Sequence, residues 1–199
     1  MTLSLGRTLS ALAVAAGLVV ATGGVASAQT LTVNDARGDV HSLSGDSSTP
    51  VAEPDVKNGD ILRTVLRHNR GRISARVKFA DVNRTGDMRG DVMRIRTNEG
   101  ITRDVSITAG PHMWRGTAEM SRPNGNTVKC DIDHKIDYDN NLVTLSFPRS
   151  CVSNPRWVRI GLGSIWIRSS SQKYYLDDSQ ISGSVNPDRL RLSGRLYRG

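Results

Sequence analysis

Aspartates gathered in two turn-rich segments are the residues best suited to chemistry in this sequence. The segments VNDARGDV (33–40) and EPDVKNGDI (53–61) combine Asp with Asn and Gly. Carboxylate oxygens are ligands that Ca²⁺ prefers, and Gly lets the backbone curve around an ion. The full EF-hand spacing is absent, however, and Asp near Gly also forms ordinary turns. Two hypotheses stay open: turns without an ion, or a calcium site with the ligands Asp35, Asp39, Asp55 and Asp60.

Two tryptophan–arginine pairs are candidates for ligand contacts. Trp157 and Arg159 share one side of an alternating pattern, and Trp166 and Arg168 share one side of the next. If the intervening GLG forms a turn or a bulge, both pairs emerge on one face. An indole ring stacks on a sugar, and a guanidinium binds a carboxylate or phosphate with two hydrogen bonds. Two interpretations stay open: these four residues bind a ligand, or the tryptophans close the ends or the second face of the sandwich.

Signatures of catalysis are missing from the sequence. It contains no G-x-S-x-G elbow, no H-E-x-x-H helix and no phosphate-binding P-loop. The four histidines are scattered: His41, His68, His112 and His134. An acid–base pair assembled from distant strands would leave no such signature. The sequence therefore favours a non-catalytic protein, with a hydrolase of unknown catalytic residues as the alternative.

The charge of the chain points to anionic partners. The formal net charge is +8, and residues 149–199 hold 9 basic but only 3 acidic residues. A basic surface attracts acidic glycans, anionic wall polymers, phospholipid headgroups or DNA. Nucleic acid is the least favoured of these, because no recognised RNA- or DNA-binding motif is present. Arginine enrichment through genomic base composition would explain the same charge without any ligand.

The first 28 residues read as a secretory signal peptide. Arg7 precedes an apolar run over residues 9–20, and the small residues Ala26-Ser27-Ala28 follow. The apolar run is shorter than the roughly 20 residues that a membrane helix needs, and no later stretch matches it. We therefore expect a secreted protein without a membrane span in its mature form, residues 29–199.

The mature chain is predicted to be all-β. ISARVKF places Ile73, Ala75, Val77 and Phe79 on one face of a strand, and similar short alternating runs recur between turn signals. Strands at this spacing favour one antiparallel β-sandwich or jelly roll, with residues 29–199 as a single domain. The polar segment 39–60 is expected to be a long surface loop.

The only two cysteines, Cys130 and Cys151, are predicted to form a disulfide. Export places the chain in an oxidising compartment, where paired cysteines are the rule. If Asn140-Asn141 is a two-residue hairpin turn, Cys130 lies directly opposite Cys151 and Ile136 opposite Leu145. PRSCV, at the end of the second arm, is the one stretch that could form a single helical turn.

Four stretches carry a resemblance to a known group of proteins: VNDARGDV, NGDILRTVLRHNRGRISARVKFADV, VTLSFPRSCVSNPRWVRIGLG and YYLDDS. They resemble uncharacterised secreted proteins of high-GC actinobacteria over nearly all of the mature chain. The resemblance implies an exported β-sandwich and, more loosely, a likeness to carbohydrate-binding jelly rolls. It implies no catalytic residue.

These observations favour a secreted, non-catalytic module that binds an anionic or glycan component of the cell envelope or its surroundings. A hydrolase of a wall polymer and a structural or protein-interaction module are the alternatives. The first would require a cleft with close acid–base partners, and the second a large exposed apolar patch or a stable oligomer. No cofactor is expected other than calcium at the aspartates.

Overall fold

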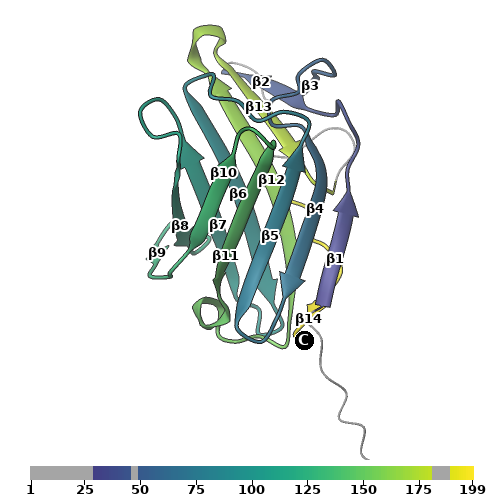
Figure 1. The fold of residues 1–199 in the computed structure, drawn as a ribbon, viewed down its shortest axis with the longest axis vertical. Helices are drawn as coiled ribbons and strands as arrows, with labels where there is room; N and C mark the ends of the chain where they lie inside the picture. The colour runs from purple at the N-terminus through teal and green to yellow at the C-terminus, as the bar shows by residue number, and fades with distance from the viewer. Residues whose placement is uncertain (1–28, 46–48, 181–188) are drawn as a thin grey trace, which may run out of the picture.

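The computed structural model describes residues 29–45, 49–180 and 189–199, and the expected signal peptide lies outside them. Two antiparallel sheets pack face to face and form a β-sandwich, as predicted (Figure 1). In the described part of the chain, none of the helical segments has the length and apolar character needed to span a membrane.

The first sheet has five strands and faces the viewer in Figure 1. Its spatial order is β1-β4-β5-β11-β10. The strands are β1 (Gln29–Asn34), β4 (Ile61–His68), β5 (Arg72–Phe79), β10 (Asp133–Asp137) and β11 (Leu142–Pro148). The alternation in ISARVKF forms β5 as expected, because its four apolar side chains are buried and its polar side chains point outward.

The second sheet has nine strands and lies behind the first. Its spatial order is β3-β2-β13-β12-β6-β7-β8-β9, with β14 also paired to β12. The strands are β2 (His41–Ser44), β3 (Val51–Ala52), β6 (Met88–Thr97), β7 (Thr102–Ala109), β8 (Thr117–Ser121), β9 (Thr127–Val128), β12 (Trp157–Arg168), β13 (Lys173–Asp178) and β14 (Leu196–Tyr197). A 3₁₀ helix, η2 (Ser169–Ser171), joins β12 to β13.

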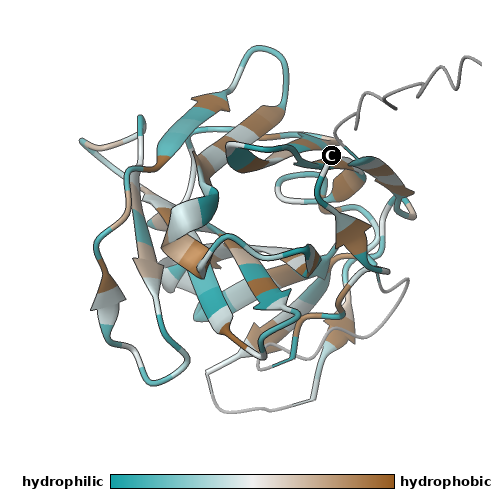
Figure 2. Cartoon of the chain, turned by 90° about the horizontal axis from the view of Figure 1, so that it is seen from below, coloured by the Kyte–Doolittle hydropathy of each residue, from teal (hydrophilic) through white to brown (hydrophobic). Residues whose placement is uncertain are grey.

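The core fills the space between the sheets. Figure 2 looks along the strands and shows apolar and polar residues alternating in both layers. Large side chains of both sheets are fully buried there, including Leu66, Phe79 and Phe147 of the first sheet and Met93 and Ile160 of the second. Burial of one face of each strand is what period-two alternation requires, and it provides the main stabilisation of a sandwich.

The Cys130–Cys151 disulfide is present, but the hairpin register predicted around it is wrong. Ile136 pairs with Val143, not with Leu145, because residues 138–141 form a longer turn than Asn140-Asn141 alone. The Asp137 carboxylate accepts a hydrogen bond from the Asn140 backbone N–H and stabilises this turn. The register moves by an even number of residues, so the buried face is preserved.

The helical turn predicted at PRSCV is present, and it brings Cys151 next to Cys130. The 3₁₀ helix η1 (Arg149–Val152) follows β11 directly and turns the chain back toward Cys130. The two Cα atoms are 5.7 Å apart. The disulfide therefore joins a helical turn to the segment before β10, and not two opposed strand positions.

Segment 39–60 is not one long loop. It contains β2, which pairs with β13, and β3, which pairs with β2. Val40, His41 and Ser42 are buried, so this segment contributes to the packed sandwich. Its short runs carry little alternation, and pairing of β2 with β13 and of β3 with β2 provides the hydrogen bonds that make them strands.

Candidate binding sites

The two tryptophan–arginine pairs do not form one site. The pairs would share one face only if GLG formed a turn or a bulge, but β12 pairs with β6 in an unbroken register from Val158 to Ile167. In a continuous strand, odd and even positions point to opposite faces. Trp157 and Arg159 therefore lie on the outer face, and Trp166 is buried on the inner face.

Both tryptophans are engaged with the protein's own residues. The Arg195 guanidinium lies 4.8 Å from the ring centre of Trp157, and Arg159 donates a hydrogen bond to the Ser193 carbonyl. The Trp166 ring packs on Tyr175 and donates from Nε1 to the Thr85 carbonyl. Arg168 stacks on the Trp166 ring at 4.9 Å. These contacts attach the first residues of β12 to the C-terminal segment and its last residues to the β5–β6 connection.

The structure also contains an aromatic pocket that was not predicted from the sequence. It lies at the loops between β5 and β6, β7 and β8, and β10 and β11. It has a volume of about 460 Å³. Trp114 and Tyr138 meet edge to face, and the Tyr138 hydroxyl donates to the Trp114 carbonyl. Arg84 stacks on Tyr138 at 4.5 Å, and the exposed Arg115 also lines the pocket. Burial raises the pKa of Tyr138.

The outer face of the five-stranded sheet is strongly basic. We call the exposed cations that it presents the basic face; they are Arg63, Arg67, Arg76, Lys78 and Lys135. The strand register arranges them in rows across the sheet. Arg67 pairs with Ser74, whereas Arg63 lies directly opposite Lys78. Two like charges at directly opposed positions destabilise a sheet, so this arrangement does not serve folding.

A shallow hollow of about 390 Å³ lies within the basic face. Arg67, Arg76 and Lys135 line it, together with the hydroxyls of Ser74, Thr144 and Ser146. Two carboxylates lie on the same face and both are paired: Asp133 with Arg72, and Asp137 with Lys135. Among the described residues, Arg63, Arg67 and Arg76 form neither an ion pair nor a side-chain hydrogen bond, so their charges are available to a ligand.

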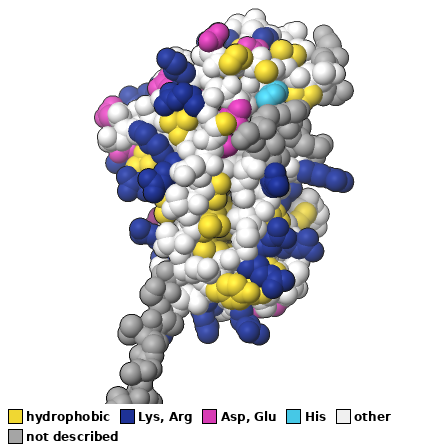
Figure 3. Space-filling view, turned by 90° about the vertical axis from the view of Figure 1, so that its right-hand side faces the viewer, with side chains coloured by type: hydrophobic (Ala, Val, Ile, Leu, Met, Phe, Trp, Pro, Cys, Tyr) yellow, Lys and Arg dark blue, Asp and Glu magenta, His cyan; other side chains and the backbone are white. Residues whose placement is uncertain are grey.

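Several of the C-terminal cations, which dominate the charge asymmetry of the sequence, are used by the fold. Arg149 is buried and donates hydrogen bonds to the carbonyls of Arg70, Asn154 and Pro155. Lys173 forms an ion pair with Glu53. Figure 3 shows that Lys and Arg side chains also protrude over much of the side formed by β1 and β4. The alternating cations in ILRTVLRH and RISARVK are the signal that could have revealed the basic face.

The predicted aspartates converge only in part. Asp35 and Asp39 each place one carboxylate oxygen within 4.8 Å of the other and of an oxygen of Asp177, a residue that the sequence analysis missed. Asp60 is buried beside them, and its Oδ2 accepts a hydrogen bond from the Gly38 backbone N–H. Asp55 is exposed and does not belong to the group. We call Asp35, Asp39, Asp60 and Asp177 the carboxylate cluster.

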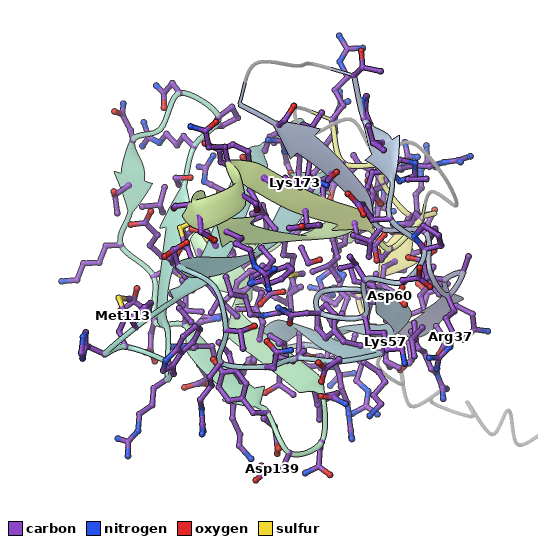
Figure 4. All side chains as sticks on the ribbon, turned by 90° about the horizontal axis from the view of Figure 1, so that it is seen from above. Arg37, Lys57, Asp60, Met113, Asp139 and Lys173 are labelled. Atoms are coloured by element: carbon purple, nitrogen blue, oxygen red, sulfur yellow. A yellow bond between two sulfur atoms is a disulfide. The ribbon has the colours of Figure 1, made fainter. Side chains whose placement is uncertain are left out.

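The carboxylate cluster lies where the chain passes between the sheets. Asp35 and Asp39 follow β1, Asp60 precedes β4, and Asp177 belongs to β13 of the other sheet. Asp177 Oδ2 accepts a hydrogen bond of 2.6 Å from the Ile61 backbone N–H, which joins the two layers. Figure 4 shows Asp60 on the opposite side of the molecule from Met113, which lines the aromatic pocket.

Burial raises the pKa of three carboxylates in the cluster, and repulsion by neighbouring carboxylates adds to this effect at Asp35 and Asp177. Burial, aided by the charge of Asp39, raises the pKa of Asp35 to about 7. Burial also raises the pKa of Asp177 to about 8, and the charges of Asp35, Asp39 and Asp60 add to this effect. Burial raises the pKa of Asp60 as well. Two consecutive aspartates at the end of an apolar strand, YYLDD, are the sequence signal that could have pointed to Asp177.

No protein-family model matches the chain, and none of the curated proteins matches it. The site geometry itself is therefore the basis for a functional assignment.

Proposed function

We propose that the protein is an exported, non-catalytic module that binds an anionic polymer through the basic face. The observation that carries this proposal is the group formed by Arg63, Arg67 and Arg76. These three exposed arginines make no ion pair among the described residues, and two of them, Arg67 and Arg76, line a hollow that also holds hydroxyl groups.

The spacing of the cations suits a chain of repeated negative charges. Neighbouring strands are about 4.8 Å apart, and alternate residues along a strand are about 6.8 Å apart. Arg76 shares a cross-strand row with Thr144 and Lys135. Arg67 shares the next row with Ser74, Ser146 and Asp133, whose charge is paired with Arg72. A polymer lying over these rows would meet a guanidinium or ammonium group at intervals of several ångströms, with hydroxyls between them. Bound anions would also relieve the repulsion between Arg63 and Lys78.

Export is part of the proposal and has separate support. The N-terminal sequence has the order of a signal peptide, and the Cys130–Cys151 disulfide forms within the domain. An anionic polymer of the cell envelope or its surroundings is the ligand class that such a protein meets. Carboxylate polymers and phosphate polymers share the chemistry that the basic face recognises, and the experiment must distinguish them.

Binding of the purified, oxidised protein to defined polymers tests the proposal. The probes are polygalacturonate, a poly(glycerol phosphate) and, as a neutral polymer, dextran, each measured at low and high salt. We expect one or both anionic polymers to bind, with affinity falling as salt rises, and dextran not to bind. Arg67→Gln/Arg76→Gln should weaken binding more than about tenfold, because each charged hydrogen bond contributes roughly 1.5–3 kcal/mol.

The matched control is Arg96→Gln/Arg122→Gln, which removes the same charge from exposed positions outside the basic face. An equal loss of binding in both double variants would show that only net charge matters and would contradict the proposed site. Binding of dextran that is lost in Trp114→Ala would instead move the function to the aromatic pocket. Cleavage of any polymer by the wild type would favour the hydrolase alternative.

A further inference from the structure

We infer that the carboxylate cluster is a calcium site, with Asp35, Asp39 and Asp177 as ligands and Asp60 beside them. Each of the three ligand residues offers an oxygen within 4.8 Å of the other two. Calcium binds oxygens at 2.3–2.6 Å, so a single ion can contact oxygens up to about 5 Å apart. The observed separation therefore lies within reach of one ion.

The second observation is an unsatisfied carboxylate oxygen in the interior. Asp60 is only 1% exposed, and its Oδ1 has no hydrogen-bond partner among the described residues. The charge of Asp60 acts on both Asp35 and Asp177, so this carboxylate belongs to the same group. Asp35 Oδ2 is buried and unsatisfied as well. Buried polar atoms in native proteins nearly always have a partner, and for anionic oxygens a cation is the fitting one.

The charge of Arg37 acts on Asp60, but no described cation lies at ion-pair distance from Asp35, Asp60 or Asp177. Arg37 and Lys57 lie on the same side as Asp60 in Figure 4, but both are exposed. The unsatisfied oxygens belong to Asp35 and Asp60, whereas both oxygens of Asp177 and both oxygens of Asp178 accept hydrogen bonds from backbone N–H groups.

The chemistry of the ligands favours calcium over other metals. All three offer carboxylate oxygen, which suits hard cations, and neither His nor Cys takes part. Magnesium requires bonds of 2.0–2.1 Å in near-ideal octahedral geometry, so its ligands lie at most about 4.2 Å apart. A single calcium ion can contact oxygens that lie within 4.8 Å of one another, whereas magnesium usually keeps several water ligands and is seldom held by protein carboxylates alone.

The bound ion would join the two sheets. Asp35 follows β1 of the five-stranded sheet, whereas Asp177 lies in β13 of the nine-stranded sheet. An ion held by both would act at the same junction as the hydrogen bond from Ile61 to Asp177. Calcium is therefore expected to act as a structural ion that stabilises the folded protein.

Calorimetric titration of the chelator-treated, oxidised full chain with CaCl₂ and MgCl₂, together with thermal unfolding, tests this inference. We expect one Ca²⁺ per chain, an unfolding midpoint that rises with Ca²⁺, and a much smaller effect of Mg²⁺. Asp35→Asn/Asp39→Asn should weaken Ca²⁺ binding at least tenfold and abolish the shift. The matched control, Asp55→Asn/Asp131→Asn, removes two exposed carboxylates outside the cluster and should bind Ca²⁺ like the wild type.

The stability of the metal-free proteins shows whether a loss of Ca²⁺ binding comes from lost ligands or from misfolding. Asn has nearly the size of Asp, so Asp35→Asn removes the repulsion from neighbouring carboxylates without opening a cavity, and the metal-free Asp35→Asn protein should be at least as stable as the metal-free wild type. If the double variant does not fold, Asp35→Asn alone is used in its place. No Ca²⁺ binding by the wild type, or equal binding by wild type and variant, would overturn the inference. An equal shift with Mg²⁺ would overturn the assignment of the metal.

Discussion

His68 and Arg149 form a buried contact that requires a neutral histidine. Arg149 Nε donates to His68 Nε2 at 3.1 Å, and His68 Nδ1 lies 2.9 Å from the Leu196 carbonyl. Because arginine remains charged, Nε2 must be the acceptor, and the proton on Nδ1 is donated to Leu196. Burial lowers the pKa of His68, and the charges of Arg149 and Arg198 lower it further.

This contact predicts that His68 contributes stability that is lost in acid. The unfolded histidine takes up a proton near its ordinary pKa of 6.5, whereas the folded one does so only at lower pH. Between these two pKa values the unfolded state binds more protons, so stability falls as the pH drops below about 6.5. The slope from this group is at most about 1.4 kcal/mol per pH unit.

Urea unfolding of wild type and His68→Gln between neutral and mildly acidic pH measures this contribution. The difference in unfolding free energy between the two proteins should shrink as the pH falls, since only the wild type loses the contribution of His68. His112→Gln is the control, because His112 is exposed. A difference that stays constant with pH would show that His68 does not titrate as its surroundings imply.

At the scale of single residues, the sequence identified part of the carboxylate cluster. Asp35, Asp39 and Asp60 were found because Asp, Asn and Gly cluster locally in loops. Asp55 satisfies the same pattern but is exposed, since a local pattern does not state which way a side chain points. Asp177 was not predicted because it is distant in sequence from the other three aspartates. Its hydrogen bond from the Ile61 backbone N–H joins residues 116 positions apart.

At the scale of elements, β12 shows why GLG is not a turn. Gly161 and Gly163 lie inside the strand and allow the segment at Leu190–Arg191 to pack directly on it. A Cβ atom at Gly161 would lie 2.6 Å from the Arg191 carbonyl oxygen. The glycines therefore provide room for a close approach of backbone to backbone, and not a change of direction.

Gly161→Ala is accordingly expected to destabilise the protein by about 1–3 kcal/mol, the usual cost of overpacking. Gly163→Ala should cost less, because its closest contact is the flexible end of the Leu190 side chain at 2.6 Å. Gly194→Ala is the control, since a Cβ there meets nothing within 4 Å. Urea unfolding ranks the three variants, and a Gly161→Ala protein as stable as the wild type would contradict the packing argument.

Strands were predictable where alternation is long, and not where it is short. β5 follows the expected pattern at every position, because an eight-residue run determines its own buried face. β2 and β3 have four and two residues, and their strand conformation depends on pairing with β13 and with each other. The hairpin register was wrong by two positions, since the length of a turn depends on its own hydrogen bonds.

At the scale of the whole molecule, the disulfide is expected to contribute about 3 kcal/mol of stability. It links cysteines 21 positions apart and so restricts the unfolded chain. Thermal and urea unfolding of Cys130→Ser/Cys151→Ser should show a lower midpoint, and reduction of the wild type should have the same effect. The reduced double variant provides the control, because reductant should not change it further. An unchanged midpoint in the double variant would contradict this prediction.

The sequence by itself determined the features that depend on neighbouring residues or on total composition. The alternation of apolar and polar residues predicted the buried face of most strands, and the presence of only two cysteines predicted the disulfide. The residue counts set the net positive charge. Only the tertiary structure decided which cations remain available and which aspartates meet. Ion pairing, burial and the crossings between sheets depend on contacts between residues distant in the chain. Several C-terminal cations, such as Arg149 and Lys173, are consequently used by the fold, whereas the basic face comes from the strands of the five-stranded sheet.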